Sequence, residues 1–106
     1  MKLPDLSSLQ FVVLGALLQG ERSGQEIRDE LAKQKLEKSG PAFYQAMSRL
    51  EDAKFVMGRY EEKMIGGQRI KERRYELTGS GERAWNQTRD FYMTIAAKAT
   101  GGLVHA

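Results

Sequence analysis

The chain has 106 residues, of which 41% are hydrophobic and 29% charged, and its formal net charge is +3. This length and balance predict one globular domain with a modest core and argue against disorder. Cysteine is absent, which excludes disulfides and thiolate nucleophiles and fits a reducing compartment.

The first predicted helix begins near Ser7 or Ser8 and ends near Gly20. Ser7 and Gln10 have the spacing of a capping box, and glycine commonly follows the last turn of a helix. The apolar run inside this helix, residues 11–18, is shorter than the roughly 20 residues that span a bilayer. No small-residue cleavage site follows it, so we expect neither membrane insertion nor a signal peptide.

This first helix is apolar on almost every side, which is typical of a helix buried on more than one side. The core of so short a chain would not easily cover it. We therefore expect part of the helix to contact a second subunit; the alternative is a central helix buried entirely within its own chain. The residues expected at the subunit interface are Leu9, Val13 and Leu17.

A second helix is predicted from Gly24 to about Lys35. Ser23 and Glu26 form a clear capping box before it. Three lysines gather at its end, where cations suit the helix dipole. An equally weighted alternative is that one or two of them touch phosphate. These residues are Lys33, Lys35 and Lys38.

A third helix follows a short turn and is expected to begin at Pro41. Proline suits the first helical position and disfavours the helical conformation at Gly40. One face of this helix is apolar and the other polar. A second amphipathic helix after a short turn is typical of the recognition helix of a helix-turn-helix.

Several polar residues of the third helix are candidates for contacts with DNA. Gln45 and Ser48 are short enough to reach base edges, and glutamine can pair with adenine. Tyr44 either gives its hydroxyl to a phosphate or is a half-buried core residue. Acidic residues near the end of the helix place the contact in its first half. The expected contact residues are Ser39, Pro41, Ala42, Tyr44, Gln45, Ser48 and Arg49.

A β-hairpin, the wing, is predicted after the third helix. A first strand from Phe55 to Tyr60 and a return strand from Gln68 to Leu77 flank the turn signal at residues 66–67. Residues 54–74 hold seven Lys or Arg and three Glu, so the positive excess of the chain lies here. Pairing with these glutamates would weaken contact with phosphate. The expected phosphate contacts are Arg69, Lys71, Arg73 and Arg74.

The last predicted helix runs from Gly79 to about Ala99, with Thr78 as its cap. Its apolar residues recur at three- and four-residue steps, and no later element can cover them, which favours a dimerisation helix. Residues 1–78 are then the winged helix-turn-helix, 79–100 the dimerisation helix and 101–106 a flexible tail. The residues expected at the dimer interface are Trp85, Thr88, Phe91, Tyr92 and Ile95.

Enzyme chemistry finds little support in the composition. The single histidine, His105, has no cysteine beside it to complete a zinc site. No nucleophile–base pair can be built from Cys or His, and no glycine-rich phosphate loop is present. We therefore expect no catalytic residues, no metal and no cofactor.

Two stretches carry a resemblance to a known family. The run YQAMSRLEDAKFV and the later run RRYELTGSGE resemble the signatures of the PadR-like winged-helix transcriptional regulators. This resemblance implies a mainly α fold with a small β-hairpin (α+β), a winged helix-turn-helix with an extra C-terminal helix. It also implies a cytoplasmic homodimeric repressor that binds double-stranded DNA, with the first and last helices forming the dimer.

The resemblance leaves other functions open. Some members of the family respond to small hydrophobic or aromatic effectors, and Trp85 is a candidate to line such a site near the dimer interface, although an ordinary interface tryptophan is the favoured interpretation. Another alternative is a winged-helix module for protein–protein contact. The sequence departs from the family pattern at Pro41, Gln45, Ser48 and Lys54, which makes a DNA sequence preference hard to transfer.

Overall fold

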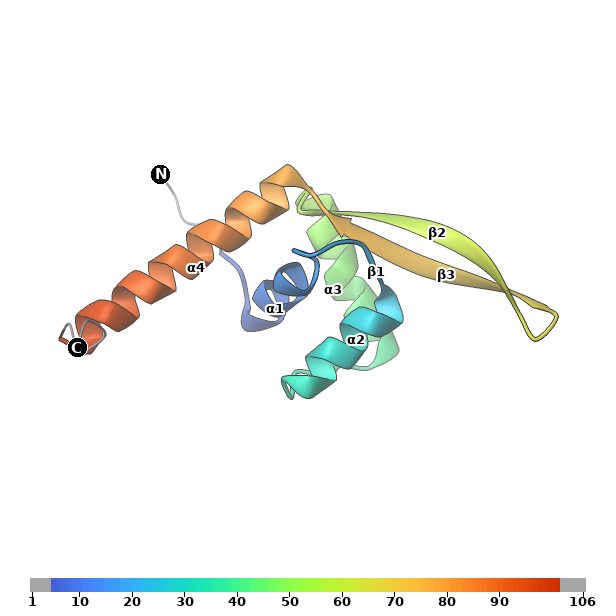
Figure 1. Ribbon diagram of the computed structural model, residues 1–106, viewed down its shortest axis with the longest axis horizontal. Coiled ribbons are helices and arrows are strands. Elements are labelled where there is room, and N and C mark those ends of the chain that lie inside the picture. Colours follow the sequence, from blue (N-terminus) through green and yellow to red (C-terminus); the bar gives the residue numbers. More distant parts are fainter. Residues whose placement is uncertain (1–4, 102–106) are drawn as a thin grey trace.

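The computed structural model describes residues 5–101, which form four helices and a three-stranded antiparallel sheet (Figure 1). The sheet order is β1-β3-β2. This arrangement confirms the predicted α+β fold class with a winged hairpin. The elements are α1 (Ser8–Ala16), β1 (Arg22–Ser23), α2 (Gly24–Lys33), α3 (Gly40–Asp52), β2 (Val56–Ile65), β3 (Gln68–Leu77) and α4 (Gly79–Ala99).

The helices follow their capping signals at the start, and the first two end earlier than predicted, whereas the last ends at Ala99 as expected. Both expected capping boxes form, at Ser7 and at Ser23. The first helix ends at Ala16 because residues 17–20 form hydrogen-bonded turns instead. The third helix starts one residue before Pro41: Ser39 is its N-cap, so Pro41 takes the second helical position rather than the first.

The hairpin is longer than predicted, and one strand was missed. The first wing strand continues past Tyr60 because its residues stay paired with β3 as far as Ile65, opposite Gln68. The two-residue strand β1 pairs with the base of β3, with Ser23 opposite Arg74. Its sequence carried only a capping signal, because a strand this short has no periodicity of its own.

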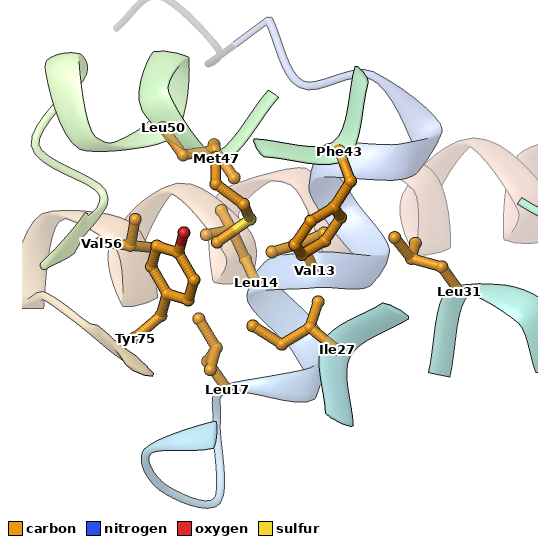
Figure 2. Packing of buried hydrophobic residues seen from close by; sticks show 10 residues of the cluster. All are labelled: Val13, Leu14, Leu17, Ile27, Leu31, Phe43, Met47, Leu50, Val56 and Tyr75. Atoms are coloured by element: carbon orange, nitrogen blue, oxygen red, sulfur yellow. The ribbon is translucent and has the colours of Figure 1, made fainter. Parts of the chain in front are cut away.

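The core lies between α1, α2, α3 and the base of the wing (Figure 2). Among its members, Val13 and Leu17 are 0% and 2% exposed. The prediction that these two residues meet a second subunit is therefore wrong, because α2 and α4 of the same chain already pack on α1. The core residues are Val13, Leu14, Leu17, Ile27, Leu31, Phe43, Met47, Leu50, Val56 and Tyr75.

Two elements project from this core in opposite directions, the wing and the second half of α4 (Figure 1). The molecule measures 59 × 28 × 23 Å with a radius of gyration of 16.3 Å, whereas a compact chain of this length would have about 13 Å. The tail predicted at 101–106 lies outside the described residues from 102 onward.

Candidate nucleic-acid interface

The third helix packs on the core through its apolar face, and the polar side of its first turns remains exposed to solvent. Phe43, Met47 and Leu50 are fully buried, and the hydroxyl of Ser39 accepts a hydrogen bond from the backbone of Ala42 at 3.3 Å. No acidic residue lies in the first turn. The positive end of the helix dipole is therefore not neutralised by its own carboxylates, which favours an anion such as phosphate there.

The predicted contact residues of α3 divide between the two flanks of the helix. Tyr44 and Ser48 lie on the flank that faces the wing. Ala42, Gln45 and Arg49 lie on the other flank, where they line a groove of about 350 Å³ with Lys38 and the start of α1. Lys33, by contrast, is paired with Glu30 at 3.8 Å. Of the three lysines at the end of α2 and after it, the structure thus places Lys38 beside the third helix.

Cross-strand register sorts the wing side chains onto two faces. Residues directly opposite each other in an antiparallel pair share a face. We call the face with Tyr60↔Arg73, Glu62↔Lys71 and Met64↔Arg69 the inner face. It carries three cations and one carboxylate among these six positions.

The inner face and α3 enclose a groove of about 430 Å³ that we call the recognition groove. Four of the predicted contact residues thus meet at one place, two from the helix and two from the wing. Glu51, Tyr60 and Tyr75 complete the lining and were not predicted as site residues. The lining residues are Tyr44, Ser48, Glu51, Tyr60, Lys71, Arg73 and Tyr75.

Arg74 lies on the opposite face, which we call the outer face. Its charge is paired with carboxylates of the same chain. Its guanidinium lies 2.7 Å from Glu21, 2.7 Å from Glu72 and 3.4 Å from Glu61, and its side chain is 18% exposed. The prediction that Arg74 is free to meet phosphate is therefore wrong. Glu61 and Glu72 belong to the wing itself, whereas Glu21 comes from outside the hairpin, which the hairpin sequence alone does not show.

We call Arg74 and the glutamates around it the outer cluster. Two of its carboxyl groups, those of Glu21 and Glu72, are held in the charged form by a lowered pKa. Hydrogen bonds from Arg59 and then Arg74 lower the pKa of Glu21. Hydrogen bonds from Arg74 and then Lys63 lower the pKa of Glu72. The outer face therefore neutralises itself, and the positive potential of the wing belongs mainly to the inner face.

Arg73 is also engaged, although it lies on the inner face. Its Nη2 is 2.8 Å from Oε1 of Glu51, and its guanidinium lies over the rings of Tyr60 and Tyr75 at 4.6 and 5.6 Å from their centroids. Arg73 was expected as a phosphate contact, but its charge is paired with a carboxylate of the third helix. Farther out, Lys71 and Arg69 are exposed, and neither has an ion-pair partner within residues 5–101.

Tyr44 is packed on one side and exposed on the other. Its ring packs edge-on against Phe43 with centroids 4.9 Å apart, yet the residue is 42% exposed. A Cβ at Gly24 would come within 2.7 Å of its hydroxyl oxygen, so α2 starts with a residue small enough to admit the ring. Tyr44 is therefore both packed and presented to the recognition groove.

The other predicted dimer residues differ in how far they are buried in the chain. Thr88 is 2% exposed and donates its hydroxyl to the carbonyl of Ala84 at 2.7 Å, so it has no surface to offer a partner, and its assignment is corrected. Leu9 and Trp85 pack at the margin of the core. Phe91, Tyr92 and Ile95 are 43%, 58% and 47% exposed on the projecting half of α4.

Other kinds of site find no support in residues 5–101. This part of the chain brings together no group of three or more metal-ligating side chains. Nor does it contain a helix long and apolar enough to span a bilayer.

Solved structures with the same fold include several transcription regulators, whereas no family model and no curated protein matches the chain. Bacillus subtilis PadR in complex with operator DNA is 26% identical with a TM-score of 0.63 over 76% of this chain, and the chain spans 45% of that protein. A PadR family regulator from Clostridium difficile R20291 is 16% identical with a TM-score of 0.75, covering 92% of this chain and 99% of the other. One from Eggerthella lenta is 20% identical with a TM-score of 0.70, covering 92% and 81%.

Proposed function

We propose that this chain, which has a PadR-like winged-helix fold, is a sequence-specific regulator of transcription that binds double-stranded DNA as a homodimer. The observation that carries the proposal is the recognition groove, where the first half of α3 and the inner face of the wing present polar and cationic side chains together. The DNA complex of the Bacillus subtilis neighbour supports the same assignment. In this view residues 1–78 bind DNA and residues 79–100 dimerise.

The dimensions of the two elements fit a duplex. An α-helix with its side chains is about 10–12 Å across, and the major groove is about 12 Å wide. The wing extends five residues beyond Tyr60 to its turn, which is about 17 Å at ~3.3 Å per residue. With α3 in the major groove, the wing therefore has the length to reach the neighbouring phosphate backbone and the minor groove beyond it.

We assign separate tasks to the residues around α3. Gln45 and Ser48, on the exposed side of the helix, read base edges. Lys71 and Arg69 contact phosphates on the wing side, and Lys38 and Arg49 contact them on the other flank. Phosphate contacts fix the position of the helix, and the base contacts give the sequence preference.

The exposed half of α4 is the proposed dimer contact. Ala84 and Thr88 are buried in the first half of α4, and the same stripe continues along the helix to Phe91 and Ile95, which are exposed within the described chain. Exposed aromatic and branched side chains in one patch mark an interaction surface. A two-fold dimer would place two α3 helices about 34 Å apart, over a pseudo-palindromic site.

We also propose that the protein represses transcription, because a dimer bound across two half-sites of an operator would block access by polymerase. No effector site is assigned to Trp85. Its ring stacks on Phe11 at 5.1 Å and its Nε1 donates to the Phe11 carbonyl, while Arg89 lies over the ring at 5.4 Å.

Selection of duplexes from random DNA with the purified protein tests the proposal. The expected result is an enriched two-fold site with half-sites about one helical turn apart. Binding to that site should weaken linearly in log–log form as salt rises, with a slope of roughly −0.9 per phosphate contact. Failure of the protein to bind any duplex at low salt would remove the proposed function.

A further inference from the structure

A single ion pair joins the third helix to the wing within the described residues. Oε1 of Glu51, near the end of α3, lies 2.8 Å from Nη2 of Arg73 in β3. Both side chains are mostly buried, 28% and 24% exposed. The pair spans the base of the recognition groove, between the element proposed to enter the major groove and the element proposed to reach the backbone.

The residues around this ion pair restrict the orientation of the Arg73 side chain. Gly58 lies beneath it, and a Cβ at that position would come within 2.6 Å of Nη2 of Arg73 and would also meet Glu51. Tyr60 and Tyr75 pack their rings against the same guanidinium. A planar guanidinium bounded by two rings, a carboxylate and bare backbone keeps a fixed orientation.

Fixing the base of the wing matters because the rest of the wing projects alone (Figure 1). From Tyr60 to the turn the hairpin extends about 17 Å at ~3.3 Å per residue, so a tilt of about 10° at the base moves the tip by about 3 Å. Lys71 and Arg69 lie two and four residues from the base, so the same tilt moves their backbone by about 1 Å and about 2 Å at ~3.3 Å per residue. Shifts of this size lengthen hydrogen bonds to phosphates beyond their normal range.

We propose, building on the DNA-binding function above, that Glu51 and Arg73 are a positioning pair that sets the angle between wing and recognition helix. Arg73 is then not a phosphate ligand. Its charge neutralises Glu51, the carboxylate that would otherwise face the DNA from the recognition groove, and their bond holds Lys71 and Arg69 at the backbone.

For one substitution, Glu51→Gln, the proposal and net charge alone predict opposite changes in affinity for DNA. Glu51→Gln removes a negative charge beside the DNA and leaves every cation in place, so charge alone predicts tighter binding. A positioning role predicts weaker binding. Asp52→Asn is the matched control, because Asp52 is the next residue on the same helix, is exposed and has no ion pair within residues 5–101.

Gly58→Ala supplies a second, independent disturbance. It keeps both charges but places a methyl group where the pair is seated. The displaced atoms are the ends of flexible side chains, and Gly58 is not among the residues with positive φ, so the hairpin is expected to fold. This variant carries the test if Glu51→Gln fails to fold, as judged by circular dichroism and thermal unfolding.

The experiment measures duplex affinity and its salt dependence for the full chain and the three variants on the selected site. Glu51→Gln and Gly58→Ala are expected to bind about tenfold more weakly, with a salt slope smaller by roughly 0.9 for each wing phosphate lost. Asp52→Asn is expected to bind as tightly as the unmodified protein or more tightly. A loss of stability alone would leave the slope unchanged well below the unfolding temperature.

Two results would overturn the inference, and they are distinguishable. If the unmodified protein binds duplex but Glu51→Gln binds as tightly or more tightly with an unchanged slope, the positioning role is wrong and the DNA-binding function stands. If the unmodified protein binds no duplex at low salt, the DNA-binding function is wrong and the positioning role falls with it.

Discussion

Trp85 of α4 and Phe11 of α1 are joined twice: their rings stack with centroids 5.1 Å apart, and Nε1 of Trp85 donates a hydrogen bond to the carbonyl oxygen of Phe11 at 3.1 Å. Gly15 lies one turn further along α1, and a Cβ there would come within 3.0 Å of Nε1. The ring thus fits against α1 through a stacked neighbour, a hydrogen bond and a bare backbone position. This contact ties the projecting helix to the domain that holds the recognition groove.

Two replacements of this tryptophan should lower the free energy of unfolding by different amounts. Trp85→Phe removes the donor but keeps an aromatic ring, and we expect it to lower the free energy of unfolding by about 1 kcal/mol. Trp85→Ala also removes the stacking surface, and we expect a loss of about 3 kcal/mol. Urea unfolding followed by circular dichroism measures both. Equal stabilities for the two variants would mean that the ring contributes only its hydrogen bond.

The sequence predicted the elements well where each has its own local signal. Capping residues placed the starts of α1, α2 and α4, and the glycine pair Gly66 and Gly67 placed the hairpin turn. That two-residue turn also sets Ile65 opposite Gln68 and hence Tyr60 opposite Arg73. The inner face of the wing was therefore within reach of sequence reasoning once the turn was known.

Contacts between distant segments were beyond such reasoning. Glu51 and Arg73 are 22 positions apart in different elements, and their pairing depends on how the wing folds back over α3. The carboxylates around Arg74 come partly from Glu21, 53 positions away. An almost wholly apolar helix such as α1 also cannot reveal whether its second side is covered by its own chain or by a partner.

Lys54 is a position where a substitution should stabilise the protein. It follows the C-cap of α3 with φ of 66°, a left-handed conformation that favours glycine. Lys54→Gly should therefore raise the free energy of unfolding by about 1 kcal/mol, the typical cost of the left-handed conformation less the added flexibility of the unfolded chain. Urea unfolding is the measurement. Lys35→Gly, at φ of 59° after α2, is the parallel case and should show a gain of the same sign; losses in both would contradict this account.

Acid should loosen the base of the wing through its outer cluster. The pKa values of Glu21 and Glu72 are lowered in the folded protein by bonds from arginine. Their contribution to stability is therefore complete above the ordinary carboxyl pKa of 4.5 and is lost as the pH falls through the lowered folded values.

Hydrogen exchange of the β3 amides, followed from about pH 6 down to about pH 3 and corrected for intrinsic rates, measures this loss. Protection of the residues near Arg74 should fall in the acid part of that range. Glu21→Gln should show the lower protection already at neutral pH. A protection profile that does not change between the unmodified protein and this variant would contradict the role of the cluster.

Wing cations should differ in their effect on DNA according to the face they occupy. Lys71→Ala and Arg69→Ala should each reduce the salt slope of duplex binding by roughly 0.9, because each removes one phosphate contact. Lys63→Ala should leave the slope nearly unchanged, because Lys63 lies on the outer face and is paired with Glu72, which keeps its 2.7 Å contact with Arg74. Binding isotherms at several salt concentrations give the slopes. Equal slope changes for Lys63→Ala and Lys71→Ala would show that the face does not matter.

The projecting half of α4 offers the sharpest test of the proposed dimer. Phe91 and Ile95 continue the stripe that begins with Ala84 and Thr88, whereas Met93 lies on another side of the helix and is 64% exposed. Phe91→Asp would place an unpaired charge in an apolar contact, which is costly because the charge loses its water. We therefore expect this variant to sediment as a monomer and to lose most of its affinity for the two-fold site, since one copy retains only half of the contacts.

Met93→Asp makes the same chemical change on the same helix turn but outside the stripe. It should remain a dimer at the same concentration and bind the two-fold site normally. Analytical ultracentrifugation across a concentration series, combined with binding to one half-site and to the full site, separates the two variants. If both variants stay dimeric, the dimer contact lies elsewhere than this stripe. If both become monomeric, the whole surface of the projecting helix is used, and the covered stripe of α4 does not predict which residues meet the partner.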